Sequence, residues 1–373
     1  MDDLFILVRI AVGTLAPMDR HLLPRMMLAL LTVLSLCAVV ISLHTNGSGH
    51  RPKAYGAPSY GFAGYSDLAT VNQISARWRV PFIASQPYFA AASTWIAAQS
   101  NDQHFIQLGT TENVTGFSRS FNVFWSDPVV HFEPQSLGVV APGNLVTFSM
   151  VKIGTGWKLR FDDRTTSKSN QVTIHYGRTT TFNEGEWIQE DPTTPDVNVH
   201  YPYPHMSLVT FSRLQLDQQA PHLSFQYAQV MSSSNGVFLI PSKVRHNQFT
   251  FHRAKGATRQ YLQDALLLST AIFPFDNDAQ DNVSPSSSTV DGLLSALRTN
   301  ISELKTQPWP KATRSDIAGI VTNLTRLRRL VRQWPVAPAT LAPQYYNELR
   351  GIDTSDETFV LDIHARLGIP PRD

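Results

Sequence analysis

The chain has 373 residues, of which 42% are hydrophobic, and a formal net charge of only +2. A chain of this length buries a sizeable core and has room for two domains. Because no stripe of lysines and arginines is concentrated over a folded region, the composition argues against a nucleic-acid-binding protein.

Residues 1–45 predict an export signal or a signal anchor. Arg20, His21 and Arg25 precede an uncharged apolar run over 26–43, which is about the length that crosses a bilayer as a helix. The run lacks the small residues that end a cleaved signal, so an uncleaved anchor is favoured. We therefore expect an extracytoplasmic protein, either secreted or anchored to the membrane through this segment.

Residues 46–60 are rich in Gly, Ser and Pro and predict a tether, whereas 61–254 show short alternating apolar and polar segments separated by turn signals. This pattern is typical of an antiparallel β-sandwich or barrel. We expect a mainly β fold, a sandwich of the concanavalin- or lectin-like jelly-roll kind. The expected strands are 73–80, 93–98, 104–108, 121–125, 145–152, 156–162, 171–176, 184–189, 207–214 and 248–253.

Beyond residue 254 the apolar residues recur at helical spacing. We expect a helix and linker over 255–288 and an additional α-helical domain over 289–373, whose role the sequence leaves open. One of its helices carries four arginines beside an apolar stripe, which predicts a solvated basic face, with a site for nucleic acid or anionic lipid as the alternative. The arginines are Arg326, Arg328, Arg329 and Arg332, and the stripe consists of Ile317, Ile320, Leu324, Leu327 and Val331. The expected helices are 261–271, 289–305, 314–334, 343–349 and 357–367.

The single cysteine, Cys37, lies inside the N-terminal apolar run. No disulfide therefore links the rest of the chain, and no thiol there acts as a nucleophile or a metal ligand. His200 and His205 lie in a proline-rich extended loop, and their spacing matches no compact metal motif. We expect neither a cofactor nor a metal, so catalysis would rely on oxygen or imidazole groups.

A run of acids marks the most informative strand. Because side chains two apart on a strand share a face, Glu184, Glu186 and Glu190 are expected on one surface, with Trp187 and Gln189 on the other. Neighbouring like charges raise one another's pKa, which is common at functional sites. An exposed strand with a solvated acidic face is the alternative interpretation.

A second polar residue interrupts the apolar strand around 104–108. Ile106 and Leu108 are expected to face the core, which leaves Gln107 on the opposite face. Gly109 beside it would give the backbone of a ligand room to approach. Taken alone, a glutamine in this position is most often an ordinary exposed strand residue.

Several short motifs resemble the glutamic peptidases, also called eqolisins, over about residues 65–253. They are Trp78-Arg79-Val80-Pro81, Ser93-Thr94-Trp95-Ile96, Ile106-Gln107-Leu108-Gly109-Thr110 and Gly185-Glu186-Trp187-Ile188-Gln189-Glu190-Asp191, with a final match near Pro241-Ser242 and Phe249. The resemblance implies a sandwich of two antiparallel seven-stranded sheets with a substrate cleft on one face. It also places the catalytic pair of that family on Gln107 and Glu186, and a cleft aromatic on Trp95.

The residue types suit the implied chemistry. The Glu186 carboxylate can take a proton from a water that attacks the scissile carbonyl, and can later pass it to the departing amine. The Gln107 amide can donate to the developing oxyanion without a charge that titrates. A glutamate with an ordinary pKa is half ionised near pH ~4.3, so an acid-acting endopeptidase is expected, with Glu184 and Glu190 able to raise that optimum.

The chain departs from the fullest version of the family pattern at two places. Gln99-Ser100 replaces an Asp-Gly that follows the cleft tryptophan, and Phe124 replaces an acid that precedes Trp125. Both replacements leave the catalytic pair unchanged.

Two other functions fit the same residues. A sandwich-fold glycoside hydrolase could use Glu184 and Glu186 as its two carboxyls, provided that their separation suits that reaction. A non-catalytic sandwich could bind glycans or peptides through Trp95 and Trp125. A protein or peptide partner is therefore expected under the peptidase interpretation, and a nucleic-acid partner under none of the three.

Overall fold

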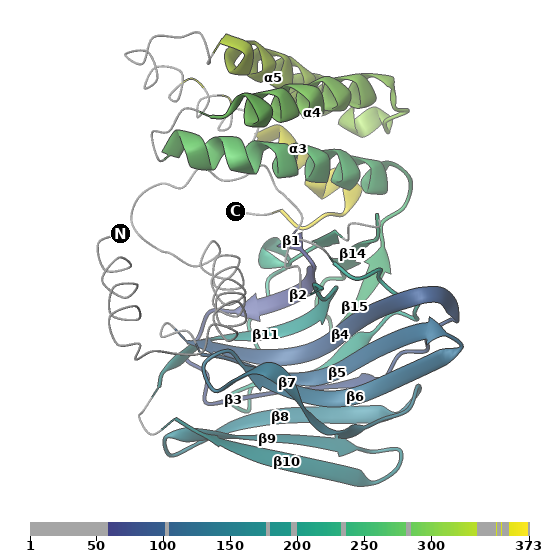
Figure 1. Ribbon diagram of the computed structural model, residues 1–373, viewed down its shortest axis with the longest axis vertical. Coiled ribbons are helices and arrows are strands. Elements are labelled where there is room, and N and C mark those ends of the chain that lie inside the picture. Colours follow the sequence, from purple (N-terminus) through teal and green to yellow (C-terminus); the bar gives the residue numbers. More distant parts are fainter. Residues whose placement is uncertain are drawn as a thin grey trace, which may run out of the picture. The chain divides into compact units, whose positions relative to one another are not determined.

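A computed structural model describes residues 59–100, 104–176, 180–194, 200–232, 236–280, 285–333, 348, 352 and 358–371 (Figure 1). The predicted export segment, 1–45, lies outside these residues, as does all but the end of the tether. Within the described ranges, no helix is long and apolar enough to cross a membrane.

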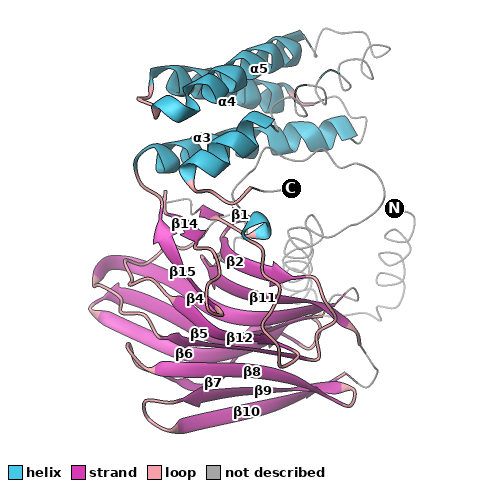
Figure 2. Cartoon of the chain, turned by 180° about the vertical axis from the view of Figure 1, so that it is seen from behind, coloured by secondary structure: helices cyan, strands magenta, loops and turns pink. Residues whose placement is uncertain are grey.

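Two largely antiparallel sheets form the β part of the chain (Figures 1 and 2). The six-stranded sheet, in spatial order, consists of β2 (Phe62–Asp67), β11 (Phe182–Glu190), β4 (Gln86–Ser100), β5 (Phe105–Gly116), β6 (Ser118–Asp127) and β7 (His131–Val139). The nine-stranded sheet consists of β1 (Ser59–Tyr60), β13 (Met231–Ser232), β14 (Phe238–Pro241), β15 (Gln248–Arg253), β12 (Thr210–Leu216), β3 (Gln73–Arg79), β8 (Leu145–Ile153), β9 (Gly156–Asp163) and β10 (Lys168–His175).

One apolar core lies between the two sheets. The six-stranded sheet contributes Ile96, Leu108 and Trp187, and the nine-stranded sheet contributes Trp78 and Phe148, among others. The rings of Trp78 and Phe148 stack with their centroids 4.3 Å apart. Burial of large aromatic and aliphatic side chains from both sheets is what holds a sandwich together.

The expected strands are found, but the division into two seven-stranded sheets is wrong. The short hairpin of β13 and β14 extends one sheet beyond β15, and β1 adds to it as a parallel strand, which makes nine. The other sheet ends with β2 beside β11 and β7 beside β6, which makes six. β2 and β7 escape the alternation pattern because glycine or proline interrupts each of them.

Three long helices follow the sandwich: α3 (Gly256–Gln280), α4 (Ser287–Thr306) and α5 (Arg314–Gln333). A further helical segment covers 358–367, whereas the helix expected over 343–349 lies outside the described residues apart from residue 348. The expected linker is partly helical, because α3 continues through Pro274. The side chain of Ser286 caps α4 by accepting from the Thr289 N–H.

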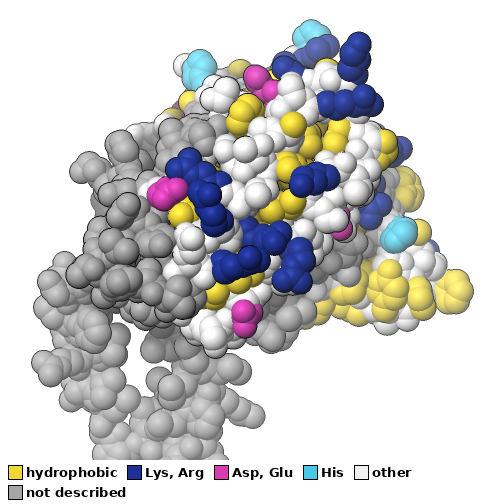
Figure 3. All heavy atoms as spheres, turned by 90° about the horizontal axis from the view of Figure 1, so that it is seen from above, with side chains coloured by type: hydrophobic (Ala, Val, Ile, Leu, Met, Phe, Trp, Pro, Cys, Tyr) yellow, Lys and Arg dark blue, Asp and Glu magenta, His cyan; other side chains and the backbone are white. Residues whose placement is uncertain are grey.

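The helices pack around a second apolar cluster, which also contains Val230, Phe238 and Ile240 of the β region. On α5 the predicted stripe of Ile317, Ile320, Leu324, Leu327 and Val331 is buried in that cluster. The arginines of α5 lie on the other side of the helix. On the face of the molecule seen in Figure 3, lysines and arginines gather with few acids between them. Arg326 pairs with Glu348 at 2.9 Å. A helical domain independent of the sandwich remains a prediction.

Candidate functional site

Strand pairing brings Gln107 and Glu186 into one row of the six-stranded sheet. Glu186 on β11 is paired with Ala97 on β4, and Ala97 is paired with Gln107 on β5. Ser126 on β6 continues the row beyond Gln107. The two residues that the family resemblance selected are therefore separated by a single strand, although 79 positions separate them in the sequence.

All members of this row face away from the sandwich core. Ile96, Ile106 and Trp187 flank the row members along their strands and belong to the core, so Ala97, Gln107 and Glu186 point to the opposite face. Ala97 belongs instead to a small apolar group on the outer face. The alternation predicted for β11 is confirmed, because Trp187 and Gln189 face inward.

Glu186 is 7% exposed and makes no hydrogen bond within the described part of the chain. Burial, followed by repulsion from Glu184 and then from Glu190, raises the pKa of Glu186 well above its ordinary range. Its carboxyl therefore holds its proton more tightly than an exposed glutamate does.

The outer apolar group lies beside the row. It consists of Trp95, Ala97, Phe124 and Ile188, with Phe62 and Phe105 at its edge. The Trp95 ring makes edge contacts with Phe62 and Phe105, at centroid distances of 6.0 and 5.7 Å. Trp95 is on the face where the resemblance placed it, but it is only 1% exposed, so its half-buried phenylalanine neighbours present more surface.

Glu190 fixes the Trp95 indole. Trp95 Nε1 donates a hydrogen bond of 2.7 Å to Glu190 Oε2. Burial raises the pKa of Glu190 to about 7, against a smaller opposing effect of this hydrogen bond. The acidic strand therefore carries one carboxyl, Glu186, without a hydrogen bond among the described residues, and one, Glu190, that accepts from Trp95.

The Gln107 amide is held from the side opposite Glu186. Ser126 Oγ donates to Gln107 Oε1 at 2.8 Å. Among the described residues no acceptor contacts Gln107 Nε2, so the amide keeps a donor for a ligand. Ser126 was not predicted, because a serine near the end of a strand gives no signal of this kind.

The two family departures lie next to the site. Gln99 is paired with Glu184, two residues along the strands from the pair of Glu186 and Ala97. Phe124 joins the outer apolar group rather than supplying a carboxyl. This face consequently lacks, at position 124, the carboxyl that the fullest family pattern implies.

Gly109 allows two strands to approach closely beside the site. A Cβ at this position would lie 2.1 Å from Thr94 O and 2.6 Å from Trp95 Cβ. Only glycine allows β5 to approach β4 this closely where Trp95 is placed.

A polar network behind the site was missed by the sequence analysis. Glu112 is fully buried between the sheets, accepting from Thr110 at 2.5 Å and from Thr94 at 3.3 Å. Thr94 also donates to Gln189 at 3.0 Å. Burial raises the pKa of Glu112 well above its ordinary range, which favours its protonated form. Glu112 lies at an even spacing from Ile106 and Leu108 along the strand, and this spacing could have predicted that its side chain faces the core.

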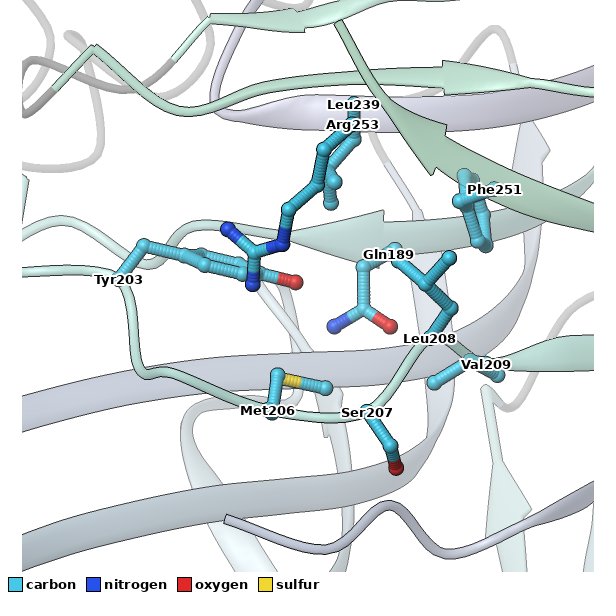
Figure 4. A pocket seen from close by; sticks show the side chains of 9 residues that line it. All are labelled: Gln189, Tyr203, Met206, Ser207, Leu208, Val209, Leu239, Phe251 and Arg253. Carbon is cyan, nitrogen blue, oxygen red and sulfur yellow. The ribbon is translucent and has the colours of Figure 1, made fainter. Parts of the chain in front are cut away.

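Gln189 points into a small pocket on the core side of β11 (Figure 4). Tyr203, Met206 and Arg253 are among its other lining residues, and the Arg253 guanidinium lies 5.9 Å from the Tyr203 ring centroid. Glu186 faces the opposite side of the same strand. The pocket therefore belongs to the packing between the sheets and not to the Gln107–Glu186 row.

The histidine loop shows ordinary contacts. His200 Nδ1 lies 2.7 Å from the backbone oxygen of Asp191, to which it donates. Within the described ranges, no group of three or more His, Cys, Asp or Glu residues could hold a metal ion.

Comparison with known proteins gives distant structural matches only. No protein-family model matches the sequence, and no curated protein matches it. Among solved structures, a scytalido-glutamic peptidase bound to a transition state analog inhibitor is 16% identical, with a TM-score of 0.44, over 53% of this chain and all of that one. The aspergilloglutamic peptidase of Aspergillus niger is 14% identical, with a TM-score of 0.37, over 44% of this chain and 99% of that one.

An alginate lyase from Klebsiella pneumoniae also matches, at 11% identity and a TM-score of 0.28, over 42% of this chain and 61% of that one. All these TM-scores lie below 0.5. Matches at this level do not decide between a peptidase and a polysaccharide-acting enzyme for this chain.

Proposed function

We propose that this protein is an endopeptidase that hydrolyses peptide bonds with a Glu186–Gln107 catalytic pair and an activated water. The observation that carries the proposal is the shared row on the outer face of the six-stranded sheet, with Ala97 between the two side chains. The motif resemblance to glutamic peptidases selects the same two residues independently of any geometry.

The spacing of the row is compatible with the proposed reaction. Two interstrand spacings put the Cα atoms of Glu186 and Gln107 about 9.6 Å apart. Side chains that leaned toward each other from this distance would leave space for a water and a peptide carbonyl. The methyl group of Ala97 is small enough to lie beneath both.

The chemistry requires two proton transfers by one carboxyl. The Glu186 carboxylate takes a proton from water as the water oxygen forms a bond to the scissile carbonyl carbon. Gln107 Nε2 donates to the oxyanion of the resulting tetrahedral intermediate. Protonated Glu186 then gives its proton to the amide nitrogen while the C–N bond breaks, which releases a carboxylic acid and an amine and regenerates the carboxylate.

The pH range follows from the surroundings of Glu186. Only the ionised carboxyl can act as the base, and burial with two acidic neighbours raises its pKa. Activity should therefore rise with pH above the ~4.3 expected for an ordinary glutamate. A weakly acidic optimum is proposed in place of a strongly acidic one.

The outer aromatic group is proposed to bind the peptide next to the scissile bond. Phe62 and Phe105 are half-buried and would contact apolar parts of the substrate. Trp95 would hold them in place, since its ring contacts both and its Nε1 donates to Glu190.

An extracytoplasmic, membrane-anchored location is proposed from the apolar run at 26–43 alone.

The proposal is tested by cleavage of casein with the purified full-length chain between pH 3 and 7. We expect the parent to produce new amino termini and Glu186→Gln, which keeps the side-chain size, to produce none. Thermal unfolding of both proteins checks that the variant is folded. A folded parent that cleaves no protein or peptide anywhere in this range would overturn the peptidase proposal.

A further inference from the structure

We propose that Ser126 is a positioning residue that determines which edge of the Gln107 amide faces Glu186. The inference rests on the proposed function, since it concerns the donor that would stabilise the oxyanion. Its basis is the 2.8 Å hydrogen bond from Ser126 Oγ to Gln107 Oε1.

A glutamine can act as an oxyanion donor in only one of its two amide orientations. The terminal torsion of glutamine is broad and roughly two-fold, so its own energy barely separates the orientations. In one of them Nε2 faces the reacting atoms, and in the other the carbonyl oxygen does and would repel an oxyanion. Some neighbouring group must therefore select the productive orientation.

Two neighbours select the same orientation from opposite sides. On β6, the Ser126 hydroxyl donates to Oε1 and so holds the oxygen edge away from β4 and β11. On β11, Glu184, Glu186 and Glu190 share the outer face, and their carboxyl oxygens are acceptors, which favours the Nε2 edge on the side of Glu186. Ser126 and the acidic strand thus act together.

The end of β6 that carries Ser126 is itself fixed. The next residue, Asp127, is fully buried and accepts from Tyr176 Oη at 2.8 Å and from the Val129 N–H at 2.8 Å. His104, just before β5, places its Nδ1 3.0 Å from Asp127 Oδ2. Asp127 therefore joins β6 to the start of the strand that carries Gln107, which keeps the Ser126 hydroxyl within reach.

Ser126 is not proposed to touch the substrate, because it is only 5% exposed. Its effect should appear in the transition state, where the oxyanion forms, and not in the binding of the uncharged peptide. This separates a positioning role from a purely structural one.

The test is steady-state cleavage of one peptide by the full-length parent, Ser126→Ala, Ser126→Thr and Gln107→Ala. We expect Ser126→Ala to lower kcat roughly tenfold at unchanged KM, the size associated with losing one hydrogen bond. Ser126→Thr keeps the hydroxyl and should restore most of the rate. Affinity for a peptide phosphinate, whose tetrahedral anion imitates the oxyanion, should fall in parallel with kcat in Ser126→Ala.

Ser120→Ala is the matched control, because Ser120 lies on the same face of β6, opposite Asn113 and remote from the row. It should leave kcat, KM and phosphinate affinity unchanged. If Ser126→Ala does not fold, Ser126→Cys replaces it, as a thiol of similar shape is a weak donor and should also lower kcat. The same loss of kcat in Ser126→Thr as in Ser126→Ala would overturn the inference.

Two different results distinguish an error about Ser126 from an error about the proposed function. Suppose that the parent cleaves the peptide and that Gln107→Ala cleaves it more slowly. If Ser126→Ala then keeps full kcat and phosphinate affinity, only the role of Ser126 is wrong. If the folded parent cleaves no peptide, the proposed function fails and the role of Ser126 fails with it.

Discussion

At the scale of single residues, the reactivity of the site depends on what surrounds Glu186. Burial contributes most to its raised pKa, and the carboxyls of Glu184 and Glu190 add to it. Each of these effects favours the protonated form of Glu186 over the ionised form that acts as the base. The neighbouring acids are therefore expected to set the pH at which the base becomes available.

Replacing Glu184 by glutamine should move the acid limb of the kcat/KM profile to lower pH. The substitution removes the stronger of the two repulsive neighbours, so the pKa of Glu186 falls and the carboxylate forms in more acidic solution. The measurement is kcat/KM for one peptide between pH 3 and 8.

Glu133→Gln is the control for this shift. Glu133 is exposed on β7 of the same sheet, and its replacement should leave the profile where it is. A profile that moves to higher pH in Glu184→Gln would contradict the assignment of Glu186 as the base.

At the scale of elements, the site depends on the register of β11, β4 and β5. Alternation along each strand correctly predicted the faces of Glu186 and Gln107, since their neighbours Trp187, Ile106 and Leu108 belong to the core. Alternation does not specify which strands pair, because pairing joins segments that are distant in sequence. Ala97, as the residue between the pair, was therefore unpredictable without the structure.

Some elements gave no usable sequence signal for a different reason. The contact of Ser126 with Gln107 depends on the β5–β6 register, which a lone serine does not reveal. In the sequence, Phe238 and Ile240 belong to an ordinary apolar run. In the structure they pack in the apolar cluster of the helices, which the run itself does not indicate. By contrast, the long helices were predicted because their apolar stripes are sustained over several turns.

Ala97→Leu should lower kcat/KM about 100-fold or more. Ala97 lies between Glu186 and Gln107, and three added carbons would occupy the space where water and the scissile carbonyl meet. Ala97→Gly keeps that space and should remain within a few-fold of the parent, which serves as the control. Full activity of a folded Ala97→Leu variant would show that the reaction does not occur between these two residues.

At the scale of the whole molecule, several carboxyls hold protons more tightly than an unfolded chain would. Burial raises the pKa of Glu190 to about 7, and burial together with Glu303 raises that of Asp264, on α3, to about 8. Glu112 and Glu186 are raised well above their ordinary range. All four carboxyls stabilise the folded state while they are protonated.

The free energy of unfolding should consequently fall as pH rises from about 4 to 8. Between the ordinary carboxyl pKa and the raised one, the folded chain keeps protons that the unfolded chain has lost, so each increase in pH favours unfolding. A decrease of a few kcal/mol is expected, since each pKa unit corresponds to about 1.4 kcal/mol. Urea unfolding at pH 4, 6 and 8 measures it.

Asp264→Asn should flatten part of this pH dependence, because an amide does not ionise and can still accept from Gln260 as Asp264 does. Asp362→Asn, at a side chain that is 54% exposed, should leave the dependence as it is. Stability that rises from pH 4 to 8 would contradict the assignment of these groups as protonated.

A double-mutant cycle on kcat/KM, with Glu186→Gln, Gln107→Ala and the two combined, shows whether the two side chains act on one transition state. If both residues act on one transition state, Gln107→Ala alone should lower kcat/KM about 100- to 1,000-fold, and the double variant should be scarcely slower than Glu186→Gln. Losses that multiply, or a Gln107→Ala variant as active as the parent, would show that the two residues do not act together.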